Sequence, residues 1–267
     1  MRYTRLCCFS IAVLAVLAAT AAGAAEKPAW CEAMRAVHAK FHGTPGYIAQ
    51  LGDSITYSMA FWSPLGWDDP DKYLTQDDGL PKRPATARWR DTIKGARDKG
   101  PECGNYSGWR VENVLGVIDG VLAREKPEAA IIMIGTNDIS GGQVPASYRP
   151  GLEKIVQKCL DAGCVPILNT IPPRRDRTPA VEEANRIVRD VARQKQVPLV
   201  DYYAECLRLR PGNSWAGTII SEDGVHPSGG KTNDYSEANL KVSGYALRNW
   251  LNFLAVRELY FRVLAAK

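Results

Sequence analysis

The sequence predicts an α/β fold in which helices cover both faces of a central parallel sheet. Short apolar segments alternate with longer amphipathic segments along most of the 267 residues, which is the order of successive β–α–β units. The apolar segments are nearly continuous, as in strands that are buried on both faces. The amphipathic segments carry apolar residues at helical spacing, and no linker or internal repeat divides the chain. We therefore expect a single domain over residues 26–267.

The first half of the chain contains two predicted helices and one predicted strand. Four large apolar residues recur at helical spacing within residues 28–42, which predicts an amphipathic helix. A short apolar strand follows at 47–51 and is closed by Gly52. Residues 57–89 are polar and aromatic with repeated Pro, Gly and Asp, and they are too long for a simple connection, so we expect a functional loop. A helix is predicted at 111–122.

The second half continues the alternation. A strongly apolar strand is expected at 129–134, and a helix at 152–160 leads through Gly163 into a strand at 165–170. Apolar residues at helical spacing predict a further helix over 181–191, followed by a strand at 197–200. A last helix of about 25 residues is expected from near Glu237, because its large apolar side chains fall on one stripe.

The first 25 residues are interpreted as a cleavable secretory signal. Two arginines precede an apolar run from Phe9 to Ala22, and small residues follow it. A membrane anchor is the alternative, but the run is shorter than the ~20 residues that span a bilayer. We expect cleavage near Ala24 or Ala25, a secreted or periplasmic location, and no membrane attachment afterwards.

Composition limits the classes of function. Hydrophobic residues make up 45% and charged residues 24%, which is typical of a globular chain rather than a disordered one. The net charge of +5 includes two arginines of the predicted signal, so the remaining excess is too mild to indicate a nucleic-acid partner. Neither the cysteine spacing nor the three histidines resemble a zinc site, and we expect no metal or other cofactor. In an oxidising compartment, one or two disulfides and at least one free thiol are expected among the five cysteines outside the signal, namely Cys31, Cys103, Cys159, Cys164 and Cys206.

The ends of the predicted strands carry residues suited to acyl transfer. Ligands of open parallel sheets bind beyond the carboxyl ends of the strands, and Ser54 stands there as a candidate nucleophile. His226 can serve as its base, and Asp223 can orient the imidazole from three residues away. The backbone N–H groups of Ser54 and Gly108 and the side-chain amide of Asn137 can act as oxyanion donors. Each residue alone is as compatible with a cap or a turn, and only the combination favours catalysis.

Together these segments resemble the SGNH/GDSL hydrolase family. The four sequence blocks of that family are matched in order by 52–54, Gly108, 135–138 and 223–227. The resemblance implies a flavodoxin-like three-layer α/β/α sandwich with a central parallel sheet. It also implies metal-free ester or thioester hydrolysis. One departure is that residues 101–106, just before Gly108, form a poor strand, whereas the family usually has a clear strand there.

The substrate is expected to be an acylated carbohydrate. Aromatic faces suit stacking on sugar rings, and guanidinium groups suit acidic substituents. The candidate rim residues are Trp62, Trp67, Trp109, Arg174 and Arg175. We therefore expect an esterase that removes short acyl groups such as acetate from a small molecule or polysaccharide. A lipase, lysophospholipase or thioesterase on the same machinery, and a non-catalytic carbohydrate-binding protein, are the alternatives; the oligomeric state is left open.

Overall fold

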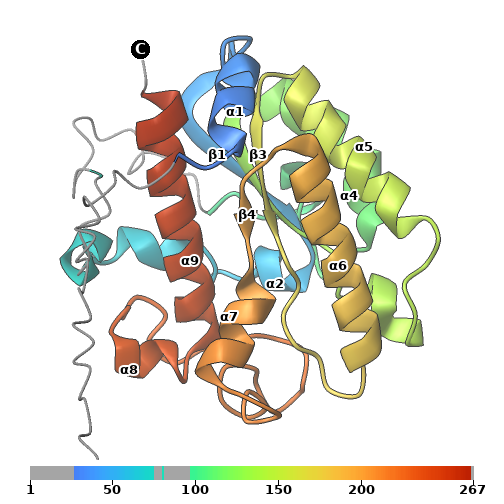
Figure 1. Ribbon diagram of the computed structural model, residues 1–267, viewed down its shortest axis with the longest axis vertical. Coiled ribbons are helices and arrows are strands. Elements are labelled where there is room, and N and C mark those ends of the chain that lie inside the picture. The colour runs from blue at the N-terminus through green and yellow to red at the C-terminus, as the bar shows by residue number, and fades with distance from the viewer. Residues whose placement is uncertain (1–26, 75–79, 81–96, 266–267) are drawn as a thin grey trace, which may run out of the picture.

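Four parallel strands form the centre of the molecule, with helices on both sides (Figure 1). In this computed structural model, residues 27–74, 80 and 97–265 are described, so the predicted signal lies outside the described residues. The strands run in the order β1-β2-β3-β4. Their bounds are β1 Thr44–Gly52, β2 Pro127–Met133, β3 Val165–Asn169 and β4 Leu199–Val200.

Parallel pairing brings the carboxyl ends of the strands to one edge of the sheet. Leu51 of β1 pairs with Ile132 of β2, Ile131 with Ile167 of β3, and Leu168 with Leu199 of β4. Every residue of β2 is buried, as expected for a strand covered on both faces. The loops that follow β1, β2 and β3 therefore meet, as the sequence predicted for the candidate site.

Helices cover the two faces of the sheet as separate layers. On one side α4, α5 and α6 pack side by side, and on the other α9 runs across the sheet with α1 beside its C-terminal extension (Figure 1). The predicted three-layer α/β/α sandwich is thus the observed fold. The helix bounds are α1 Trp30–His38, α2 Ser54–Tyr57, α4 Val111–Glu125, α5 Tyr148–Asp161, α6 Thr178–Lys195, α7 Tyr202–Leu209, α8 Glu237–Leu240 and α9 Gly244–Leu259.

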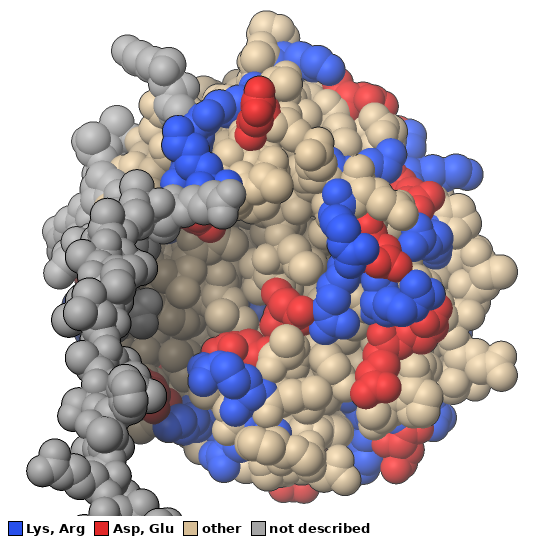
Figure 2. Space-filling view, in the orientation of Figure 1, with Lys and Arg blue, Asp and Glu red and all other residues tan. Residues whose placement is uncertain are grey.

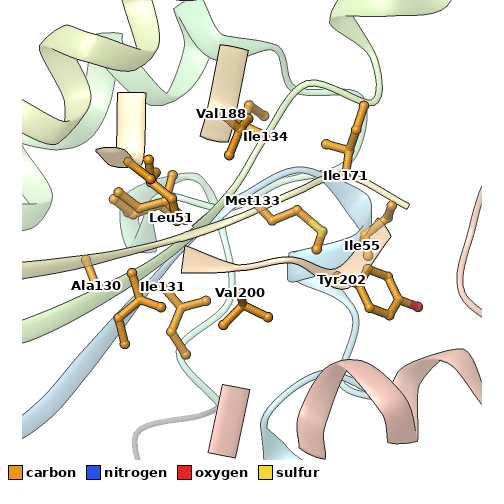
Figure 3. Packing of buried hydrophobic residues seen from close by; sticks show 14 of the residues in the cluster. Leu51, Ile55, Ala130, Ile131, Met133, Ile134, Ile171, Val188, Val200 and Tyr202 are labelled. Carbon is orange, nitrogen blue, oxygen red and sulfur yellow. The ribbon is translucent and has the colours of Figure 1, made fainter. Parts of the chain in front are cut away.

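The core is built from side chains that alternate between the two faces of the sheet. Figure 3 shows Ile134 beside Val188 of α6, whereas Met133 points to the other face, toward Ile55 and Tyr202. All five side chains are buried. Burying an aliphatic or aromatic side chain of this size stabilises the fold by about 1.5–3 kcal/mol. The residues just before the strand-end loops are therefore firmly fixed, and they hold those loops in place.

Two expectations about the last third of the chain are corrected. The predicted 25-residue helix is divided into α8 and α9, because Ser243 caps a new helix by accepting a hydrogen bond from Ala246 N. Helix α7 was not predicted, because it starts almost directly after the two-residue strand β4. Within the long 57–89 stretch, the described residues form two 3-10 turns, Ser63–Gly66 and Pro70–Tyr73.

The cysteine prediction is also corrected. Cys31, Cys103, Cys159, Cys164 and Cys206 all carry free thiols. Four of them are buried, and Cys103 is partly buried, so they pack as small apolar side chains. Exclusion from solvent raises the pKa of the Cys206 thiol and keeps it protonated.

Charges of both signs are mixed on the surface. Over α6, basic and acidic side chains are interspersed (Figure 2), and Arg186 pairs with Glu183 at 2.7 Å and with Asp190 at 2.9 Å. Within the described part of the chain, no helix combines the length and apolar character needed to cross a membrane.

Candidate active site

Ser54 is the first residue of the single-turn helix α2, which is separated from β1 by Asp53 alone. The turn requires glycine at position 52, because a Cβ there would lie 2.3 Å from the Met133 carbonyl oxygen and 2.4 Å from Thr56 Oγ1. Asp53 caps the helix by accepting a hydrogen bond from Ile55 N at 3.0 Å. Burial raises the pKa of Asp53 to about 6, in spite of that hydrogen bond and of Arg248 nearby. The Ser54 hydroxyl is therefore presented at a helix N-terminus beyond the end of the sheet.

His226 and Asp223 complete a hydrogen-bonded chain that begins at Ser54. His226 Nε2 lies 2.8 Å from Ser54 Oγ, and His226 Nδ1 lies 2.6 Å from Asp223 Oδ2. Asp223 Oδ1 accepts three further hydrogen bonds, from Ser221 Oγ and from the backbone N–H groups of Val225 and His226. Partial burial raises the pKa of Asp223, but these hydrogen bonds outweigh it and hold the pKa well below its usual range. An ionised Asp223 fixes the imidazole with its proton on Nδ1, which leaves Nε2 free to accept from Ser54.

The three candidate oxyanion donors, Ser54 N, Gly108 N and the Asn137 amide, come from three loops at the same edge of the sheet. Neither Ser54 N nor Gly108 N donates to an acceptor among the described residues. Gly108 has φ +78°, a left-handed conformation that glycine adopts without strain. The Asn137 side chain donates to Trp109 O at 3.0 Å, which fixes its amide and leaves the second N–H for another acceptor.

Asp138 joins the two donor loops. Its carboxylate accepts from Val111 N, the first N–H of α4, with both oxygens at 3.2 Å. The positive end of the helix favours a carboxylate there, while burial raises the pKa of Asp138 to about 6. Together with the Asn137–Trp109 contact, this fixes the loop after β2 against the loop that carries Gly108. The sequence pattern placed Asp138 beside the site without indicating this role.

Two basic side chains hold the other end of α2, one buried and one partly buried, and sequence reasoning missed both. Arg248 of α9 is fully buried and donates to Ile55 O at 2.8 Å and to Thr56 Oγ1 at 2.9 Å. Lys99 donates to Thr56 O at 2.7 Å and to Gln50 Oε1 at 2.6 Å. Burial lowers the pKa of Arg248 to about 10 and that of Lys99 to about 7, where Arg248 adds repulsion. Cations are favourable at a helix C-terminus, so this pair stabilises the turn whose first residue is Ser54.

The five predicted rim residues differ in burial and in hydrogen bonding. Trp62 is only 1% exposed, and its backbone N–H donates to Asn249 Oδ1, so the expectation that its indole borders a groove is wrong. Trp67 is 59% exposed at the end of a 3-10 turn. Trp109 is half-buried and adjoins Asn137 through its carbonyl. Arg174 Nη1 donates to Thr136 O and Ser140 Oγ, whereas the Arg175 side chain is exposed.

No group of three or more potential metal-ligating side chains occurs among residues 27–74, 80 and 97–265. The arrangement that does occur consists of a hydroxyl, an imidazole, a carboxylate and three N–H donors at one edge of an α/β/α sandwich. Fold and site together define the class of this protein, a serine hydrolase that acts on ester bonds. The chain belongs to the GDSL-like lipase/acylhydrolase family, whose profile matches residues 51–229.

A curated relative agrees with this assignment, and solved structures share the fold. Esterase TesA of Pseudomonas aeruginosa is 26% identical over 179 residues, which cover 67% of this chain and 78% of that protein. Two of the solved structures that share the fold show the degree of similarity to this chain. The esterase EstA of Pseudoalteromonas, inhibited by monoethylphosphonate, matches with a TM-score of 0.52 and 16% identity, over 81% of this chain and 99% of that one. A carbohydrate esterase family 3 protein from Talaromyces cellulolyticus matches with a TM-score of 0.51 and 20% identity, over 79% and 98%.

Proposed function

We propose that this chain is an exported esterase that removes short acyl groups, acetyl in particular, from carbohydrates, with Ser54 as nucleophile. The observation that carries the mechanism is the unbroken chain of short contacts from Ser54 Oγ through His226 to Asp223, at 2.8 and 2.6 Å. Export rests on the signal-like N-terminal segment of the sequence.

The reaction proceeds in two acyl-transfer steps. Ser54 Oγ attacks the ester carbonyl carbon while its proton passes to His226 Nε2, and Asp223 stabilises the imidazolium that forms. The negative charge of the tetrahedral intermediate falls on the former carbonyl oxygen, where Ser54 N, Gly108 N and Asn137 Nδ2 donate hydrogen bonds. The bond to the alcohol oxygen then breaks, and the alcohol leaves with the proton from His226. Water, deprotonated by His226, attacks the acyl-enzyme, releases the carboxylic acid and restores Ser54.

The openness of the site supports a bulky alcohol. The side chains of His226 and Asp223 are 41% and 48% exposed, so the leaving-group side of Ser54 is open to solvent. An alcohol that belongs to an oligosaccharide can therefore approach Ser54 past these two exposed side chains. The Talaromyces protein that shares this fold is a carbohydrate esterase, which supports the same choice of substrate.

Hydrolysis of acyl esters by the chain from residue 26 onward tests this function. We expect turnover of 4-methylumbelliferyl acetate that falls from butyrate to octanoate, release of acetate from acetylated polysaccharide, and labelling of Ser54 by a phosphonate. Ser54→Ala should abolish turnover and labelling, whereas Ser58→Ala, at the end of the same helical turn, should keep both. A preference for octanoate would indicate a lipase or thioesterase instead. Binding of carbohydrate without any turnover would indicate a non-catalytic protein.

A further inference from the structure

We infer that the surface between the loop after β3 and residues 211–216 is a saccharide-binding subsite for the alcohol part of the substrate. This inference rests on the proposed function and adds to it the place where the sugar chain binds. Its residues are Arg175, Asp176, Thr178, Asn213 and Trp215, which we call the 175–215 subsite.

The 175–215 subsite adjoins the catalytic loop through Arg175. Arg175 N donates to Gly224 O at 2.8 Å, and Gly224 directly follows Asp223. The two residues pack closely, because a Cβ on Gly224 would lie 2.6 Å from Arg175 Cβ. On the preceding residue, Arg174 Nη1 donates to Thr136 O, next to Asn137. The segment 174–175 therefore connects the loop of the oxyanion amide with the loop of the base. A substrate whose alcohol part extends from Ser54 across this segment enters the 175–215 subsite.

The surface here is hollowed on a scale that suits single sugar rings. Two hollows of about 310 and 300 Å³ lie side by side and share Thr178, Asn213 and Trp215. Each volume is at the lower end of the range for small-molecule sites, which runs from about 300 to 1,000 Å³. Two adjacent hollows of this size fit neighbouring units of an oligosaccharide better than one long acyl chain, which would need a continuous apolar channel.

Four polar side chains of the 175–215 subsite are free to bind hydroxyl groups. Those of Arg175, Asp176, Thr178 and Asn213 are exposed, and none of them forms a hydrogen bond or ion pair with another described residue. A carboxamide, a hydroxyl and a carboxylate provide both donors and acceptors, which sugar hydroxyls require. Trp215, 5% exposed, forms an apolar floor beneath them. The guanidinium of Arg175 adds a preference for sugars that carry a carboxylate.

Kinetics on a small and a large acetyl ester test the subsite. The Asn213→Ala/Thr178→Ala double variant should raise KM for an acetylated xylo-oligosaccharide about tenfold, the effect of about 1.4 kcal/mol of lost binding. The same variant should leave kcat/KM for 4-methylumbelliferyl acetate unchanged, because that ester does not reach the hollows. Arg175→Gln should raise KM only for an acetylated oligogalacturonate. Gln157→Ala, an amide on the outer face of α5, is the matched control and should change nothing.

The possible outcomes separate the subsite from the proposed function. An unchanged KM for the oligosaccharide in the double variant, with normal turnover of both esters by the unmodified chain, overturns the subsite and leaves the esterase function standing. Turnover of the small ester alone by the unmodified chain overturns the carbohydrate substrate and the subsite together. If no ester is cleaved at all, the proposed function fails. Calorimetric titration with deacetylated xylo-oligosaccharide then decides the subsite, and absence of binding overturns it.

Discussion

Replacing Arg248 by methionine should slow catalysis even though Arg248 does not reach the candidate site. The substitution removes the hydrogen bonds to Ile55 O and Thr56 Oγ1, at 2.8 and 2.9 Å, and the contact of the guanidinium with the Phe61 ring, 3.5 Å from its centroid. The short helix α2 then loses the side chain that fixes its C-terminal end, and Ser54 at its other end can tilt away from His226.

The expected magnitudes follow from these contacts. A buried carbonyl left without a donor costs about 1–3 kcal/mol, and the cation–π contact adds about 1 kcal/mol. Part of this loss is recovered, because a buried charge no longer has to be desolvated. We therefore expect the free energy of unfolding to fall by about 2 kcal/mol. A displacement of about 1 Å at the reacting atoms can cost about 10²-fold in rate, so kcat should fall by about that factor with little change in KM.

The assay combines steady-state kinetics on 4-methylumbelliferyl acetate with urea unfolding. Arg248→Lys should recover part of kcat, since an ammonium can reach one of the two acceptors. Arg257→Met, a buried arginine on the same helix, is the matched control; it should destabilise the protein but keep kcat. If Arg248→Met unfolds at the expected lower urea concentration but turns over at the normal rate, then α2 does not depend on Arg248 for the position of Ser54, and the reasoning is refuted.

Four further substitutions have expected outcomes. Asn137→Ala should lower kcat by about 10²–10³ with a smaller change in KM, since one oxyanion donor contributes about 3–4 kcal/mol to the transition state; a loss confined to KM would contradict this. Asp223→Asn should lower kcat by about 10⁴ in a protein that stays folded, because the amide does not hold the required tautomer; near-normal turnover would exclude the mechanism. The melting temperature should fall slightly, because the ionised carboxylate accepts four hydrogen bonds. Burial raises the pKa of Asp53 from 3.8 to about 6, so the stability that its protonated carboxyl contributes is present below pH 3.8 and is lost as the pH rises through 6. Asp53→Asn should therefore raise the melting temperature at pH 8 more than at pH 4. An equal change at both pH values would refute the sign. Trp62→Ala should lower stability by about 3–5 kcal/mol in a denaturant titration, and a selective loss on polymeric substrates would restore Trp62 to the rim.

Sequence patterns predicted the layers and most strands because burial on both faces leaves a continuous apolar run. Residues 129–134 are such a run, and they coincide with β2 to within two residues at its start and one at its end. The break before α9 was missed because apolar residues continue at helical spacing on both sides of Ser243 and Gly244, and this spacing outweighed the glycine as a sign of a break. A serine signals a cap only when the backbone places it there, and the apolar stripe alone does not reveal this.

The candidate catalytic residues were found because they stand in short, ordered sequence blocks. The role of Arg248 was not found, because Ile55, which it contacts, lies 193 positions away in the sequence. No local sequence pattern indicates such a contact. The burial of Trp62 was missed for a related reason. Its φ of 67° turns the chain so that the indole enters the core, and a tryptophan in a polar loop gives no sign of that turn.

The segment before Gly108 has a consequence for the dynamics of the protein. Instead of an edge strand it forms the 3-10 helix Pro101–Cys103, joined to β1 by a single bridge between Gly52 and Asn105. The Asn105 side chain adds a hydrogen bond to Gln50 O at 2.8 Å. The backbone of this segment pairs with β1 at Gly52, whose N–H donates to Gly104 O at 3.0 Å and whose carbonyl accepts from Tyr106 N at 3.3 Å. Because this pairing is confined to one residue of β1, we expect the amide hydrogens of the segment to exchange with solvent by a local fluctuation. The amide hydrogens of β2 should exchange only when the whole protein unfolds. The edge of the sheet that precedes Gly108 is thus less protected than its centre, and the contacts of Asn137 with Trp109 and of Asp138 with Val111 keep the oxyanion loop in place when that edge opens.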